Sequence, residues 1–342
     1  MDIATHEGKI AFCTMVIRGK KYIPGAICLA KSILYNAKKE GISRSSFDVI
    51  CMIDDATEPW RTDLDIFDYV VSIKPISFPS NIAEWTKNGQ QRYGSWISDS
   101  YTRAHFLSID NLVNEQYTPP KPISYTRKIV IDADIFFVKW PAGLLTCRTP
   151  AAWFSYIGDE RLHMPNKFPI KSLFPVDRKE DSLIPLETMR KVIAGNLGYR
   201  TYALSEPILI VDSNLGLSTA DFVGFMVDLL QKYPNGYGHP HLISGFSEQA
   251  FAEYFVSKEL PMYHVGVQYA TMIWYPEMLK VEGLEPKDIV GIHVFGTKKP
   301  WGVLDDYKEF FNYTDADVKD VMSYDDTPLW LAYYKLKVAK DW

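Results

Sequence analysis

Short apolar runs alternate with amphipathic stretches over the first 140 residues. An apolar run bounded by polar or turn residues is typical of a buried strand, and we predict strands at Lys9–Val16, Phe47–Ile53, 69–73 and 128–131. Pro24 begins a helix after the first strand, because proline in the first helical turn loses no hydrogen bond, and a second helix is expected from about Glu58. This alternation predicts an α/β fold with a single Rossmann-like, doubly wound, mostly parallel sheet.

The rest of the chain continues the pattern with longer irregular segments. Residues 78–93 are polar and irregular and precede a helix from about Asp99, and residues 158–181 predict a long loop. Further on, strands are expected at 207–211 and 289–294, and helices near 219–231 and 248–255. We therefore predict a tail at 1–8, one domain at 9–304, and a C-terminal helical extension at 305–342 that packs on the domain.

Composition and charge narrow the classes of partner. The chain is 47% hydrophobic and carries a formal charge of −5, so we expect no binding to nucleic acid or to an anionic membrane surface. The N-terminus lacks the pattern of a signal peptide, and no apolar run approaches the roughly 20 residues that span a bilayer. The four scattered cysteines lack metal-site spacing and predict reduced, buried thiols. The expected location is cytoplasmic.

Two carboxylates follow the strand predicted at 128–131. Asp132 and Asp134 flank Ala133 within an otherwise apolar run. Isolated buried charge is costly, so these acids must be paired, solvated or bound to a cation. In an open α/β sheet, ligands bind beyond the carboxyl ends of the strands, where two such acids can reach one hard cation. Ala133 also lets a ligand approach the backbone. Two ordinary loop acids are the alternative interpretation.

A second cluster of polar residues follows the strand predicted at 289–294. His293 can supply a nitrogen ligand, and mixed oxygen and nitrogen ligation suits Mn²⁺ better than Mg²⁺. Gly296 permits close approach of the backbone to a phosphate, and Lys299 offers a positive charge to it. The alternative is a core histidine followed by an ordinary basic loop. Together with the acids, the cluster favours a metal site that holds a diphosphate.

Four segments, in this order, resemble motifs of glycosyltransferase family 8, the glycogenin and galactinol synthase group. They are GKKYIPGA at 19–26, YTR at 101–103, IDAD at 131–134 and HVFGTKKPW at 293–301. The sequence SEQAF at 247–251 is a softer match. The chain departs from the family at Glu206, where an Asn-x-Gly motif is common; an acid there cannot donate a hydrogen bond to a sugar as an amide does.

The resemblance implies a GT-A fold, a UDP-sugar donor, Mn²⁺ (with Mg²⁺ as the alternative) and transfer with retention of anomeric configuration. It also assigns roles to individual residues. The metal ligands are Asp132, Asp134 and His293. The catalytic residues are Glu248, which faces the transferred sugar, and Lys299, which neutralises the leaving diphosphate. Tyr22 stacks on uracil, and the other donor-binding residues are Arg103, Ala133, Gln249, Gly296 and Lys299.

The sequence thus predicts a retaining glycosyltransferase that uses a UDP-sugar. Two other classes stay open: a non-catalytic scaffold that binds a UDP-sugar, and a glycoside hydrolase built on Asp132 and Glu248. The expected acceptor is a small polyol, a glycan or another protein, and a homodimer is compatible with the sequence. Glycogenin carries its own acceptor tyrosine, and Met272 takes that place here, with Tyr269 and Tyr275 nearby.

Overall fold

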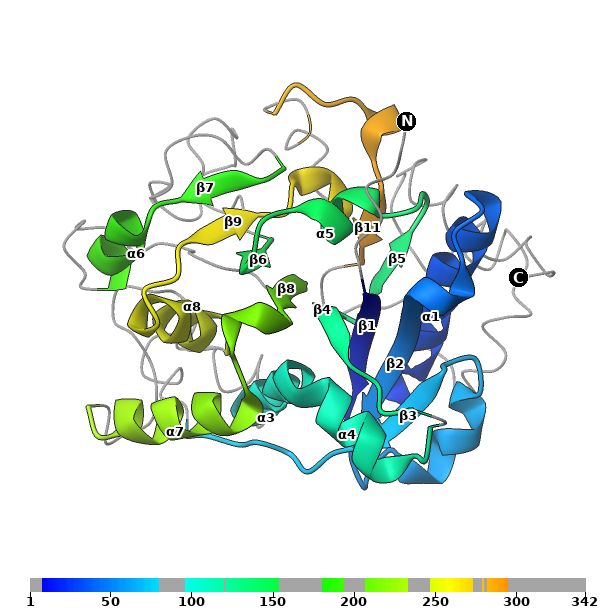
Figure 1. Cartoon of the computed structure of the whole chain (residues 1–342), viewed down its shortest axis with the longest axis horizontal. Coiled ribbons are helices and arrows are strands. Elements are labelled where there is room, and N and C mark those ends of the chain that lie inside the picture. Colours follow the sequence, from blue (N-terminus) through cyan, green and yellow to red (C-terminus); the bar gives the residue numbers. More distant parts are fainter. Residues whose placement is uncertain are drawn as a thin grey trace.

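The computed structural model describes residues 8–79, 96–119, 121–153, 180–193, 207–232, 247–272, 279 and 282–294. Its centre is an eight-stranded sheet in the order β3-β2-β1-β4-β8-β6-β9-β7 (Figure 1). The strands are β1 (Lys9–Val16), β2 (Phe47–Ile53), β3 (Tyr69–Ser72), β4 (Tyr125–Ile131), β6 (Ala151–Ala152), β7 (Ser182–Ile184), β8 (Ile208–Asp212) and β9 (Met262–His264).

The N-terminal half of the sheet is parallel, as the sequence predicts. β1 pairs with β2 and with β4, and β2 pairs with β3, all in parallel. β1 and β2 have the predicted bounds, while β4 begins three residues before the expected Lys128. Beyond β4 the sheet becomes mixed, because β8 runs antiparallel to both β4 and β6. The sheet is therefore mostly parallel, with a reversal at β8 that local sequence patterns did not reveal.

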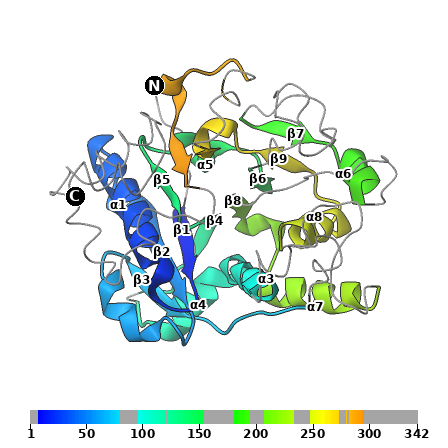
Figure 2. The ribbon, with the colours of Figure 1, turned by 180° about the vertical axis from the view of Figure 1, so that it is seen from behind.

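Helices lie against both faces of this sheet, which gives the doubly wound arrangement. α1 (Ile23–Lys39) lies over β1 and β2, whereas α7 (Thr219–Leu230) and α8 (Ser247–Ser257) lie beside the β8–β9 half in both views (Figures 1 and 2). The remaining helical elements are α3 (Trp96–Asp99), α4 (Ile109–Gln116), α5 (Ala142–Thr146), α6 (Leu186–Ile193) and the 3-10 helices η1 (Lys20–Tyr22), η2 (Arg44–Ser46), η3 (Glu58–Leu64), η5 (Ser100–Ser108), η6 (Ser213–Leu215), η7 (Val267–Tyr269) and η8 (Pro286–Asp288).

The helix predicted from Glu58 is a 3-10 helix rather than an α-helix. It begins in a tight turn, in which the backbone N–H groups of Thr57 and Glu58 both donate to the carbonyl of Asp54. The segment has only seven helical residues before the chain reaches β3, too few for a stable α-helix without strong packing.

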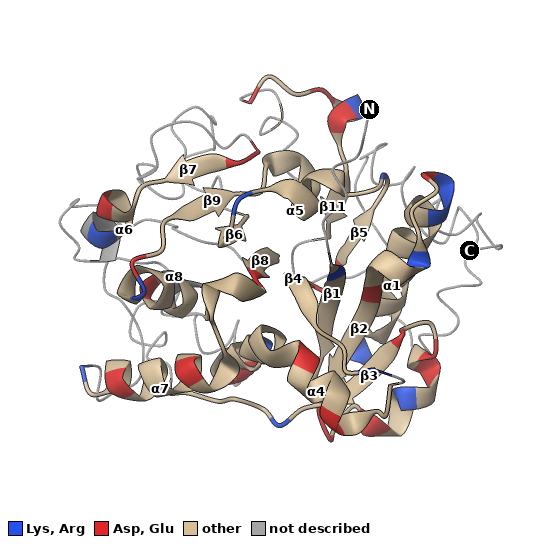
Figure 3. Cartoon of the chain, viewed as in Figure 1, with Lys and Arg blue, Asp and Glu red and all other residues tan. Residues whose placement is uncertain are grey.

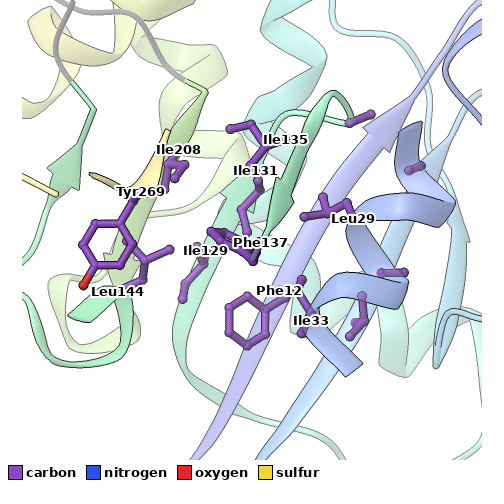
Figure 4. Close-up of a cluster of buried hydrophobic side chains, with 14 of the residues drawn as sticks. Phe12, Leu29, Ile33, Ile129, Ile131, Ile135, Phe137, Leu144, Ile208 and Tyr269 are labelled. Atoms are coloured by element: carbon purple, nitrogen blue, oxygen red, sulfur yellow. The ribbon is translucent and has the colours of Figure 1, made fainter. Parts of the chain in front are cut away.

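The alternation of side chains along β1 separates two hydrophobic clusters. Phe12 packs with Leu29 and Ile33 of α1 and with Ile129 of β4 on one face (Figure 4). Cys13 points to the other face, in a cluster with residues from η5, α4, α7 and α8. Both faces of the central strands are thus buried, which explains why they read as continuous apolar runs in the sequence.

A second, three-stranded sheet brings the chain back to the end of β4. Its order is β10-β11-β5, with β5 at Ile135–Phe137, β10 at Thr271–Met272 and β11 at Gly291–His293. β11 is antiparallel to β5, so that His293 pairs with Ile135, the first residue of β5. The strand predicted at 289–294 is therefore confirmed in a shorter form, and the small sheet places its last residue beside residues 132–134.

Lysine and arginine positions are interspersed with aspartate and glutamate positions along the part of the chain that the structure describes (Figure 3). None of the described helices combines the length and apolar composition that crossing a bilayer requires. The four cysteines are buried and unbridged, as expected. The predictions for residues 1–7, for most of the loop at 158–181 and for the extension at 305–342 lie outside the described residues.

Candidate functional site

Three loops meet at one edge of the main sheet. β1, β2 and β4 are parallel neighbours, so their carboxyl ends lie at the same edge. The loop after β1 carries Tyr22, the loop after β2 carries Asp54, and the loop after β4 carries Asp132 and Asp134. This is the edge at which open α/β sheets bind their ligands.

The structure brings together the acid pair and His293, which are far apart in sequence. One ligand atom from each of Asp132, Asp134 and His293 lies within 4.8 Å of the others. The Nε2 atom of His293 is 3.3 Å from Oδ1 of Asp134, and the side chains of these two residues are only 3% and 10% exposed. Asp132 lies nearer the surface, with its side chain 30% exposed.

Backbone hydrogen bonds fix this group in place. The N–H of Asp132 donates to the carbonyl of Pro207 over 2.8 Å, and the carbonyl of Asp132 accepts from Ile135 over 3.1 Å, which closes a turn between β4 and β5. The carbonyl of Asp134 accepts from the N–H of Val294 over 2.9 Å. Residues 132–134 are therefore held both by the main sheet and by the strand that carries His293.

The donor set fits a divalent cation. Metal–oxygen distances of about 2.1–2.6 Å allow two ligand atoms on one ion to lie up to about 5 Å apart, which accommodates the 4.8 Å separation within Asp132, Asp134 and His293. Two carboxylates and an imidazole concentrate negative charge and lone pairs in a largely buried place, where a cation offsets the cost of burial. Carboxylate oxygens and an imidazole nitrogen are ligands that several divalent cations accept in proteins.

Arg103 and Tyr22 adjoin the acid group. Arg103 on η5 forms an ion pair with Oδ1 of Asp132, and its side chain is only 13% exposed. The pKa of the half-buried Tyr22 phenol is raised, first by burial and then by the charges of Asp134 and Asp132. Tyr22 lies in the loop after β1, at the same edge of the sheet as the acids. Ala133 is buried between the two acids, with 6% of its surface exposed.

For the remaining site residues predicted from sequence, the structure describes either the backbone alone or nothing. Glu248 and Gln249 lie in the first turn of α8, but their side chains are outside the described part of the structure. α8 begins close to η5, since the N–H of Ser247 donates to Oγ of Ser100 over 3.4 Å. Gly296 and Lys299, together with the departing position Glu206, lie outside the described residues.

Other residues shape this edge although no motif pointed to them. The hydroxyl of Thr14 donates to the carbonyl of Ile131 over 2.8 Å and so ties the end of β1 to the residue before the acids. Arg18, in the loop that carries Tyr22, forms an ion pair of 3.0 Å with Asp99 at the end of α3. Hydroxyl and charge partners this distant in sequence leave no local signal that would have identified them.

Comparisons with known proteins support the fold. The structure is similar to that of the WbbM bifunctional glycosyltransferase, with a TM-score of 0.50 and 12% identity over 98% of this chain. This chain spans about half of that protein, covering 52% of its length. An active-site mutant of LgtC gives a TM-score of 0.48 at 9% identity, over 88% of this chain and 94% of that one.

Mouse xyloside xylosyltransferase 1 gives a TM-score of 0.42 at 14% identity, over 83% of this chain and 97% of that one. No protein-family model and no curated protein sequence matches the chain. The likeness to WbbM and the sheet topology show the α/β fold of GT-A glycosyltransferases.

Proposed function

We propose that this chain is a Mn²⁺-dependent, retaining glycosyltransferase of the family 8 type, which transfers a sugar from a UDP-sugar to the hydroxyl of a separate acceptor. The observation that carries the proposal is the convergence of Asp132, Asp134 and His293 within 4.8 Å. This group lies at the ligand-binding edge of a GT-A fold, where Arg103 pairs with Asp132 and the loop after β1 carries Tyr22. The two acids and the histidine come from segments far apart in the sequence, and each offers a ligand atom to the same small region.

Each described residue has a task that follows from its surroundings. Asp132, Asp134 and His293 hold the cation, and the ion pair with Arg103 keeps the partly exposed Asp132 carboxylate oriented. When bound, Mn²⁺ supplies positive charge to the diphosphate of the departing UDP. Tyr22 offers an aromatic face for the uracil ring. The small side chain of Ala133 adds little bulk between the two acids, where the donor approaches them.

The family resemblance supplies the tasks of the remaining residues. Gly296 and Lys299 assist in neutralising the diphosphate, which is the main electrostatic demand of the reaction. Glu248 stabilises the positive charge that develops at the anomeric carbon or binds a sugar hydroxyl, and Gln249 lies beside it on the donor. In the step itself, the bond from the anomeric carbon to the phosphate oxygen breaks. The acceptor oxygen then bonds to that carbon from the face that UDP leaves and passes its proton to the departing diphosphate, so the configuration is retained.

We propose that the acceptor is a separate molecule rather than Tyr269 of this chain; Tyr275, the other tyrosine near the place of the glycogenin acceptor, lies outside the described residues. Tyr269 is buried, with 4% of its surface exposed, and its hydroxyl is 3.1 Å from Oε1 of Glu180. A hydroxyl packed in this way cannot reach a donor sugar without local unfolding. We propose a small polyol, a glycan or another protein as acceptor. The buried thiols suit a reducing compartment, and we propose the cytoplasm as the location.

A UDP-release assay over a panel of UDP-sugars tests the function. With Mn²⁺ present, one donor should release UDP slowly by hydrolysis and faster once its acceptor is added, and EDTA should abolish both activities. Tight UDP binding without turnover of any donor points instead to a scaffold. Hydrolysis of a glycoside without nucleotide points to a hydrolase. Full transfer activity in excess EDTA contradicts the metal assignment.

A further inference from the structure

Asp54 binds the loop that carries Tyr22. Its carboxylate lies directly after β2 and is nearly buried, with 5% of the residue exposed. Oδ2 accepts from the backbone N–H of Arg18 over 2.9 Å, across 36 residues of sequence. Oδ1 accepts from the N–H and the hydroxyl of Thr57, over 3.0 and 2.7 Å. The carboxylate thus joins the turn after β2 to the loop after β1.

Thr57 makes a second link to the same loop. Its hydroxyl oxygen accepts from the N–H of Gly19 over 3.1 Å, and the residue is fully buried. Asp54 and Thr57 therefore hold two successive backbone N–H groups, those of Arg18 and Gly19. We call these two side chains the Asp54–Thr57 clamp. Charge-assisted hydrogen bonds to backbone N–H groups are among the stronger ones in proteins.

The clamped loop has a backbone that few residues adopt. Arg18 has a φ of 66° and Gly19 a φ of 94°. Gly19 also has a ψ of −159°, a region that essentially only glycine occupies. Such dihedral angles persist only where surrounding contacts hold them. Tyr22 follows three residues after Gly19, at the end of η1, so the direction of this turn decides where the Tyr22 ring lies relative to the acids.

We infer that Asp54 and Thr57 are positioning residues for the nucleotide: they hold the loop at 18–22 so that Tyr22 faces the base of the UDP donor. This inference rests on the proposed function. Neither side chain contacts the donor in this assignment; both act through Tyr22. Loosening the clamp lowers the fraction of molecules whose Tyr22 is in place, and the apparent affinity for UDP falls by that fraction. The chemical step, once the donor is bound, is unaffected.

A matched pair of variants at Thr57 tests the inference. Thr57→Val keeps the shape and removes the hydroxyl, whereas Thr57→Ser keeps the hydroxyl. With Mn²⁺ present, the Kd for UDP from calorimetry should rise about tenfold in Thr57→Val and stay within about threefold in Thr57→Ser. The KM for the donor should follow the Kd, with kcat changed by less than about twofold. Asp55→Asn, an exposed neighbour of the clamp, is the control for a substitution in the same turn and should behave as the wild type.

Gly19→Ala perturbs the same loop without removing any polar group. An added methyl group would meet Trp60 and Ala56 only at 3.8 and 3.9 Å, so the substitution acts through the backbone angle and not through a clash. It should also weaken UDP binding by about tenfold. This variant provides the test if Thr57→Val does not fold.

A double-mutant cycle with Tyr22→Ala separates positioning from general destabilisation. If Thr57 acts through Tyr22, Thr57→Val should change the Kd by less than about threefold once Tyr22 is absent. An equal effect in both backgrounds overturns the inference, as does a wild-type Kd in both Thr57→Val and Gly19→Ala. If the wild type binds UDP and both variants bind it with the same Kd, the inference is wrong but the proposed function still holds. A wild type that binds no UDP with Mn²⁺ overturns both.

Discussion

The group formed by Asp132, Asp134 and His293 should make the stability of the chain depend on divalent cations. The ligand oxygens of the two acids lie within 4.8 Å of each other. Two unit charges at this separation repel by about 1 kcal/mol in water and by about 3.5 kcal/mol at the effective dielectric constant of partly buried sites. Arg103 offsets part of this repulsion at Asp132. In EDTA, Asp134→Asn should therefore be as stable as the wild type, or more stable by about 1–3 kcal/mol.

Mn²⁺ should reverse this order. A ligand that binds only the folded state at 100 times its Kd stabilises the fold by about 2.7 kcal/mol. At an unfolding entropy of about 2.1 cal/mol/K per residue, a chain of 342 residues gains about 1.4 °C in Tm per kcal/mol. The wild type should thus gain about 4 °C, and Asp134→Asn less than about 1 °C.

Differential scanning calorimetry after dialysis against EDTA measures both effects. Mn²⁺ is added stepwise to the wild type, to Asp134→Asn and to Asp55→Asn, whose exposed carboxylate lies outside the group. The control should follow the wild type. Equal Mn²⁺ shifts in the wild type and Asp134→Asn refute the assignment of these ligands. A loss of stability in metal-free Asp134→Asn refutes the estimate of charge repulsion.

Three further predictions concern the rest of the fold. Arg127 is 3% exposed and forms a two-bond ion pair with Asp212, so Arg127→Met should lower the free energy of unfolding in urea by about 3 kcal/mol. The control Arg190→Met, at an exposed pair, should cost less than about 1 kcal/mol, and equal losses would contradict the difference in burial. Burial raises the pKa of Glu180 above its ordinary value of 4.5. The stability that the protonated Glu180 carboxyl contributes is therefore full below about pH 4.5 and is lost as the pH rises through the raised pKa. Glu180→Gln should flatten that part of the curve of unfolding free energy against pH, and an unchanged slope would contradict it. The four cysteines are buried, and burial raises the pKa of Cys28 to about 12. Ellman's reagent should therefore label the native chain only as it unfolds locally, and should label all four thiols at once in denaturant. Rapid labelling of the native chain would contradict this burial.

The parallel half of the fold could be predicted from sequence because its signals are local. β1 and β2 have the predicted bounds, and Pro24 does mark the start of α1. Strands buried on both faces are continuous apolar runs, which stand out against polar turns. The reversal at β8 could not be predicted in this way. β8 is also an apolar run, and its direction depends on which neighbours its backbone bonds to, not on its own residues.

The candidate site was likewise predicted in part from the sequence and decided in part by the tertiary structure. Residue types and spacing predicted that the acids follow a strand. Together with His293, they favoured a divalent cation over ordinary loop acids and a core histidine, because these are properties of side chains and their neighbours in sequence. Only the tertiary structure decided that His293 lies 3.3 Å from Asp134, since this distance follows from the antiparallel pairing of β11 with β5. The bond from Asp54 to the loop of Tyr22 likewise joins segments 36 residues apart. Such contacts form when the whole sheet closes, and the chain carries no local pattern for them.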